Sequence, residues 1–133
     1  MSNASTYIDI YTSLGYLFYS VAAGDGKVRL AEVERLKALV KGKWLPLEAS
    51  RDEFGTDAAH YIGMSFDFAM GEGMDSEEAY NRFAEDFRSH ASSYDAGMKR
   101  LVLETATAIS EAFARTNKAE RERLDRLGRL LGR

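Results

Sequence analysis

Residues 8–23 have the sequence Ile-Asp-Ile-Tyr-Thr-Ser-Leu-Gly-Tyr-Leu-Phe-Tyr-Ser-Val-Ala-Ala, and they decide the fold class. One set of residues recurs at the spacing of a helical face: Ile8, Tyr11, Gly15, Phe18 and Ala22. A second set lies beside it: Ile10, Leu14, Leu17 and Val21. Because such a helix is apolar over much of its circumference, we expect it to lie at the centre of a core.

Helical spacing of apolar residues continues along the rest of the chain, and no segment indicates a strand. It predicts a second helix that ends near Gly42, and further helices over 58–70, 75–90, 95–114 and the residues after Asn117. Residues 44–57 are predicted to connect two helices, with one helical turn starting at Pro46. The expected fold is all-α, a single compact bundle of six to seven helices.

Two helix starts carry a capping pattern. Asp75 and Asn117 are predicted N-caps, and a glutamate follows each of them three residues later, at Glu78 and Glu120. In this pattern the cap side chain accepts a hydrogen bond from a backbone N–H of the first turn, and the glutamate accepts one from the cap residue.

The chain of 133 residues is long enough for one core, since 45% of its residues are hydrophobic. Residues 1–6 are assigned to a disordered N-terminus or a remnant of tag cleavage, and 7–133 to the helical domain. The absence of cysteine excludes disulfides, thiolate zinc sites and cysteine nucleophiles. The apolar stretch 14–23 is shorter than the ~20 residues of a membrane span, and no signal peptide is evident. We expect a cytoplasmic protein, with peripheral association at the inner membrane surface as the alternative.

Charge is unevenly distributed along the chain, whose net charge is −3. Residues 48–95 contain twelve acidic and three basic side chains, whereas 115–133 contain three acidic and seven basic ones. Such asymmetry gives either an acidic and a basic face that can meet a partner, or simply solvated helix faces. Nucleic acid is not an expected partner, because its binding favours a basic domain with clustered, uncompensated Lys or Arg.

Two helix-loop-helix segments superpose at an offset of 88 residues. The offset places Ala31 on Ala119, Glu32 on Glu120, Leu36 on Leu124 and Leu39 on Leu127. The sequence therefore predicts a pseudo-duplicated helical domain. The copies differ in their loops, because the first contains Gly24, Asp25 and Gly26 where the second has two alanines and a phenylalanine.

The stretch 21–36, Val-Ala-Ala-Gly-Asp-Gly-Lys-Val-Arg-Leu-Ala-Glu-Val-Glu-Arg-Leu, resembles the Ala-x-x-Asp-Gly-x-Val-x-x-x-Glu-x-x-x-Leu signature of TerB-like domains. These domains are associated with tellurite-resistance proteins and resemble the N-terminal region of DjlA co-chaperones. The resemblance implies a compact, helical, non-enzymatic domain of a bacterial stress-response system, with metal-ion binding and partner recruitment as proposed roles. Asp25, Gly26 and Glu32 match the signature residue by residue.

The Asp-Gly loop allows a structural and a functional interpretation. In the structural one, Gly26 adopts a positive φ, Val28 packs inward and Glu32 lies in the first turn of the helix. In the functional one, Asp25 binds a divalent cation weakly, together with carboxylates from elsewhere. A calcium-binding EF-hand loop is not expected, because its first and third positions would be Val21 and an alanine.

Two further pairs contain residue types that bind metals or transfer protons. His60 and Asp67 share one helix face in an apolar neighbourhood, so they extend the candidate metal ligands to Asp25, Glu32, His60 and Asp67. The same pair supports a remote alternative, an acid–base enzyme. Asp86 and His90, four residues apart, are interpreted as polar neighbours on an exposed face.

The function expected from the sequence is a non-enzymatic TerB-like binding or scaffold domain with a protein partner. The alternative is a metal-ion-binding stress protein that uses Asp25 and Gly26. No catalytic motif with a nucleophilic serine, a phosphate-binding loop or a zinc-binding histidine pair is present in the sequence.

Overall fold

The computed structural model describes residues 3–24, 26–47, 58–112 and 118–132, and within them the chain is helical without strands. The helices are α1 (Asn3–Ala22), α2 (Leu30–Leu39), α3 (Leu45–Leu47), α4 (His60–Glu72), α5 (Ser76–His90), α6 (Ala96–Glu111) and α7 (Lys118–Leu130). A π-helical turn (Val40–Trp44) joins α2 to α3, and a 3₁₀ turn (Ala91–Ser93) precedes α6. The predicted all-α bundle of six to seven helices is confirmed.

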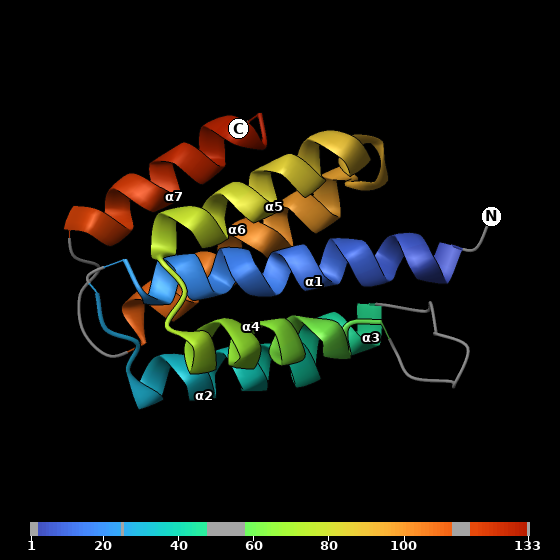
Figure 1. Cartoon of the computed structure of the whole chain (residues 1–133). Helices are drawn as coiled ribbons and strands as arrows, with labels where there is room; N and C mark the ends of the chain where they lie inside the picture. Colours follow the sequence, from blue (N-terminus) through green and yellow to red (C-terminus); the bar gives the residue numbers. More distant parts are fainter. Residues whose placement is uncertain (1–2, 25, 48–57, 113–117, 133) are drawn as a thin grey trace.

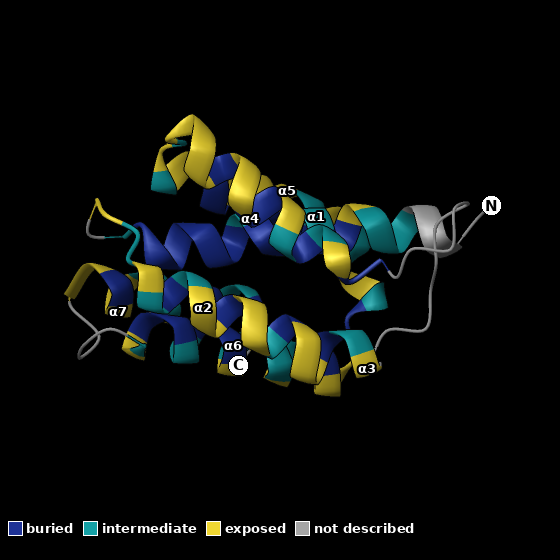
Figure 2. Ribbon diagram, turned by 90° about the horizontal axis from the view of Figure 1, so that it is seen from below, coloured by how far each residue is buried: buried dark blue, intermediate teal, exposed yellow. Residues whose placement is uncertain are grey.

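Helix α1 is the central element of the bundle. It runs through the middle of the molecule, with α2 and α4 on one side and α5, α6 and α7 on the other (Figure 1). Its C-terminal half is almost entirely buried and is mostly dark blue in Figure 2. Six of its apolar side chains have no solvent exposure: Ile10, Leu14, Leu17, Phe18, Val21 and Ala22. The central position predicted for this helix is therefore confirmed. The helix begins at Asn3, inside the segment that the sequence assigned to a disordered or tag-derived N-terminus.

Gly15 allows α1 and α4 to approach closely. A Cβ atom at this position would lie 1.8 Å from the Ser65 Oγ and 2.4 Å from the backbone oxygen of Ile62. Both distances are shorter than any van der Waals contact, so only glycine fits between the two helices. At the far end of the same contact the Tyr19 hydroxyl donates a hydrogen bond of 2.6 Å to the backbone oxygen of Met74, in the turn between α4 and α5.

The helical path after α2 is longer than the sequence predicted. It passes through Gly42 and Trp44, so the predicted break between these residues is wrong. The helical turn predicted at Pro46 is present as α3, and residues 48–57 of the predicted connection lie outside the described residues. Trp44 is fully buried, and its indole N–H donates a hydrogen bond of 3.0 Å to the Thr105 hydroxyl on α6. Burial of this large side chain stabilises the segment by more than the ~1 kcal/mol that an internal glycine costs.

The repeat predicted from the sequence is reflected in the helices. α2 and α7 begin at residues 30 and 118, which differ by the predicted 88. Six buried positions of α1 have buried counterparts in α6 at this offset: Ile10, Leu14, Leu17, Phe18, Val21 and Ala22 correspond to Met98, Val102, Thr105, Ala106, Ile109 and Ser110. Glu32 and Glu120 each lie at the third position of their helix, and each is only 3% exposed.

The structure confirms the predicted N-cap at Asp75, but Glu78 does not make the reciprocal hydrogen bond of a capping box. The Asp75 carboxylate accepts hydrogen bonds from the backbone N–H groups of Glu77 and Glu78, at 3.0 and 3.1 Å. The Glu78 carboxylate forms an ion pair with Arg82 at 3.1 Å. The other predicted cap, Asn117, lies outside the described residues.

Candidate functional site

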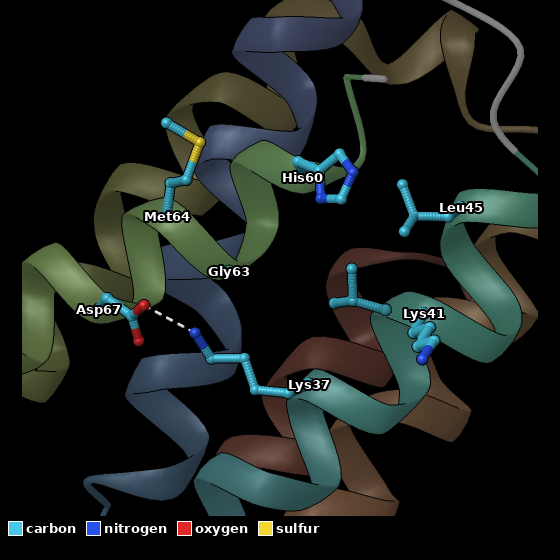
Figure 3. Close-up of a pocket in the computed structure, with 8 residues that line it drawn as sticks. Lys37, Lys41, Leu45, His60, Gly63, Met64 and Asp67 are labelled. Carbon is cyan, nitrogen blue, oxygen red and sulfur yellow. Dashed lines mark hydrogen bonds and ion pairs between the residues drawn. The ribbon is translucent and has the colours of Figure 1, made fainter. Parts of the chain in front are cut away.

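An open groove of about 570 Å³ lies between α4 on one side and α2 with its π-helical turn on the other. It is lined by Lys37, Val40, Lys41, Leu45, His60, Gly63, Met64 and Asp67. Figure 3 shows how these side chains come from the two facing helical segments. These segments are separated in the chain by residues 48–59, so the groove depends on tertiary packing and not on local sequence.

An ion pair crosses the groove. The Lys37 ammonium and the Asp67 carboxylate lie 2.6 Å apart, and their side chains are 44% and 50% exposed (Figure 3). The lysine side chain lies over Gly63, where a Cβ would be in ordinary van der Waals contact with the Lys37 Nζ, at 3.7 Å. The Asp67 carboxylate lies at the surface of a helix that also exposes large apolar side chains, and it pairs there with a base, Lys37.

The exposed side of α4 carries large apolar side chains beside the polar His60, Asp67 and Glu72. Four large hydrophobic side chains are exposed among the described residues, and three of them belong to α4: Met64 at 55%, Phe68 at 53% and Met70 at 39%. Met64 also lines the groove, and Phe68 lies one turn along α4 from Met64, so the exposed apolar side chains begin at the edge of the groove. We call this surface the α4 face: the groove together with Met64, Phe68 and Met70. Grouped exposed apolar side chains mark sites of association more often than single ones do.

The candidate metal ligands do not come together. His60 and Asp67 line the groove, whereas Glu32 lies at the start of α2, which is at the opposite end of the bundle from the start of α4 (Figure 1). The Glu32 carboxylate accepts a hydrogen bond of 2.7 Å from the backbone N–H of Arg29. Asp25 lies outside the described residues. Among the residues that the structure describes, no group of three or more His, Asp or Glu side chains could hold a metal ion.

The loop between α1 and α2 has the predicted conformation where it is described. Gly26 has a φ of +90°, and this positive value confirms the prediction. Val28 is half-buried and packs against the core. Gly24 lies close to α7, because a Cβ there would be 3.5 Å from the Glu120 side chain. The end of α1 therefore lies against the start of α7 at Gly24.

Asp86 and His90 form part of a half-buried polar cluster between α1 and α5. The His90 Nδ1 lies 3.2 Å from the Asp86 Oδ1, and the Ser13 hydroxyl donates a hydrogen bond of 3.0 Å to the Asp86 Oδ2. Burial raises the pKa of Asp86, and the hydrogen bond from Ser13 opposes this shift. The buried Tyr94 hydroxyl lies beside the same group, and its pKa is raised by burial and by the charge of Asp86. The prediction that Asp86 and His90 lie on an exposed face is wrong.

A charged network that the sequence did not indicate attaches α7 to α5. The Arg126 guanidinium forms two hydrogen bonds of 2.9 Å with the Glu77 carboxylate, and Arg123 lies 3.3 Å from the same group. Both guanidinium groups stack over the Tyr80 ring, at 5.1 Å for Arg123 and 4.4 Å for Arg126. The hydrogen bonds from Arg126 lower the pKa of Glu77. This network occupies charged side chains that would otherwise be available to a partner.

Comparisons with protein families, with curated proteins and with solved structures found no match to this chain. The resemblance to TerB-like domains therefore stays a prediction. None of the helices in the described residues has the length and hydrophobicity needed to cross a membrane.

Proposed function

We propose that this chain is a non-enzymatic binding module that recognises a protein partner through the α4 face. The observation that carries the proposal is the concentration of exposed Met64, Phe68 and Met70 on one helix beside an open groove. The likeness of residues 21–36 to TerB-like domains suggests a bacterial stress-response system as its setting.

The energetics of burial support this surface as a binding site. Transfer of a Met or Phe side chain from water into an interface is worth roughly 1.5–3 kcal/mol. The inner face of α4 already supplies buried residues to the core, among them Ile62 and Phe66. The outer apolar side chains are therefore not needed for packing of the bundle, and a partner would gain from covering them.

The chemistry of the groove supports recognition and not catalysis. The groups there that could exchange a proton with a substrate are Lys37, Lys41, His60 and Asp67. All four are exposed, and Asp67 is paired with Lys37. Acid–base catalysis gains from a site that is closed to water, and this groove is open to solvent.

Site-specific photocrosslinking in the native cells tests the proposal. A photoreactive phenylalanine analogue replaces Phe68 on α4 and, as the control, Glu85 on the exposed face of α5. We expect a discrete protein adduct from position 68 and none of the same size from position 85. Equal adducts from both positions, or none from position 68, would show that the α4 face is not the recognition surface.

A further inference from the structure

We infer that the partner of the α4 face is an amphipathic helix with acidic residues along one flank of its apolar stripe. The inference rests on the proposed function and adds the chemistry of the partner. Three features of the surface support such a partner: the shape of the groove, the spacing of the exposed side chains and the charges on one wall.

The shape of the groove suits a helix. Its walls are themselves helical segments, and its apolar lining comes from Val40, Leu45 and Met64. Met64 and Phe68 are four residues apart on α4, so they form a ridge with a rise of about 6 Å. An incoming helix with apolar residues at positions i, i+3 or i+4, and i+7 matches such a ridge and fills the groove beside it.

The charges on the α2 wall select an acidic flank. Lys37 and Lys41 are four residues apart, and both line the groove. Lys41 is exposed and forms no ion pair within the described part of the chain. Carboxylates spaced by three or four residues on the partner helix would face these two ammonium groups.

The ion pair across the groove gives the inference a distinctive signature. Asp67 holds Lys37 over Gly63, and it also places a negative charge where the acidic flank of a partner would lie. A partner carboxylate would replace Asp67 as the group that binds Lys37. Loss of the Asp67 charge should therefore strengthen binding, whereas reversal of the Lys41 charge should weaken it.

Selection of peptides from a displayed library tests the inference. The library has a helix-forming frame with randomised positions, the target is the whole chain, and the Phe68→Asp variant serves for counter-selection. We expect enrichment of sequences with apolar residues at helical spacing and with Asp or Glu on one flank. Enrichment of basic or proline-rich extended sequences, or failure to enrich any, would overturn the inference.

Affinities of a selected peptide for four variants complete the test. We expect Phe68→Asp to weaken binding at least tenfold, Lys41→Glu to weaken it and Asp67→Asn to strengthen it, each by about two- to fivefold. Arg88→Glu, on the exposed face of α5, should leave the affinity unchanged. If Lys41→Glu changed the affinities of acidic and neutral peptides equally, the acidic flank would be contradicted, but the amphipathic helix would not. Insensitivity to Phe68→Asp would also overturn the proposed function.

A membrane is the other surface that lysines and exposed apolar side chains can meet. Vesicles of phosphatidylglycerol and phosphatidylcholine distinguish the two. The inference would be overturned if the chain bound these vesicles, lost this binding in Phe68→Asp and selected no peptide from the library. The partner would then be a lipid surface and not a helix.

Discussion

Helices α4 and α5 both pack along α1, yet their outer faces differ. Their inner faces are alike, with Phe66 of α4 and Phe83 of α5 both fully buried against the core. The outer face of α4 carries Met64, Phe68 and Met70, whereas that of α5 carries charged residues: Glu77, Glu78, Arg82, Glu85 and Arg88. Because the two helices pack on α1 in the same way, the difference between their outer faces depends on what each outer face meets.

The charged face of α5 is engaged inside the molecule. Glu77 binds Arg126 of α7, and Glu78 pairs with Arg82 one turn along the helix. Among the described residues, the only ion pair made by α4 is that between Asp67 and Lys37. The comparison suggests that α5 is satisfied within the fold and that α4 is available to a partner.

The largest expected effect separates the two faces of α4. Phe66→Ala should lower the free energy of unfolding by about 3–5 kcal/mol, because it leaves a cavity in the core. Phe68→Ala, two residues away on the outer face, should change it by less than about 0.5 kcal/mol. Urea denaturation measures both. Comparable losses in the two variants would show that the outer face also stabilises the fold.

A smaller effect is expected at the contact that places α4. Gly15→Ala should lower the free energy of unfolding by about 1–3 kcal/mol, since the added methyl group would overlap the Ile62 backbone and the Ser65 side chain. Gly71→Ala on α4 is the control. Nothing lies within 4 Å of a Cβ there, so a gain of up to about 1 kcal/mol is expected. A Gly15→Ala protein with the unfolding free energy of the wild type would contradict the close approach of α1 and α4.

The ion pair of Glu77 on the charged face of α5 should make the free energy of unfolding depend on pH. The change should be at most about 1 kcal/mol, because Glu77 is half exposed. Arg126 holds the folded-state pKa of Glu77 below its ordinary value of 4.5. The stabilisation is therefore present above pH 4.5 and is lost as the pH falls through the lowered pKa. Glu77→Gln should be less stable than the wild type at pH 7, and the difference should shrink in acid. Thermal unfolding at several pH values measures it, and a difference that grows in acid would contradict the network.

The smallest effect is expected for the ion pair on the α4 side. A double-mutant cycle with Lys37→Met and Asp67→Asn should give a coupling energy of about 0.2–1 kcal/mol, because both side chains are largely solvated. Urea denaturation of the wild type, the two single variants and the double variant gives the four unfolding free energies of the cycle. A coupling well above this range would mean that the pair is part of the framework and is not free to exchange with a partner.

Local features of the fold could be predicted from the sequence because they depend on neighbouring residues. The N-cap at Asp75 and the positive φ of Gly26 follow from the chemistry of single side chains. The repeat could be found because buried positions and helix starts recur at one offset. Trp44 escaped prediction, because nothing in its neighbourhood indicates that its indole reaches Thr105 on α6.

The candidate site depends on pairings between distant segments. Glu122 is the acidic residue four positions before Arg126 on α7, yet Arg126 binds Glu77, which is 49 residues away. In the same way, Lys37 meets Asp67 across 30 residues. Neither contact has a local signal. The exposed Phe68 could not be told from the buried Phe66, because helical spacing does not show which neighbours cover a helix.

The absence of a side chain at Gly15 affects how tightly the α4 face can bind. Because the backbones of α1 and α4 meet at this residue, α4 cannot slide or tilt without a clash against the central helix. The α4 wall of the groove is thus held in place before a partner arrives. On binding, the conformational entropy lost on the α4 side is then mainly that of a few flexible side chains, chiefly methionines. Ordering of the protein therefore opposes binding less.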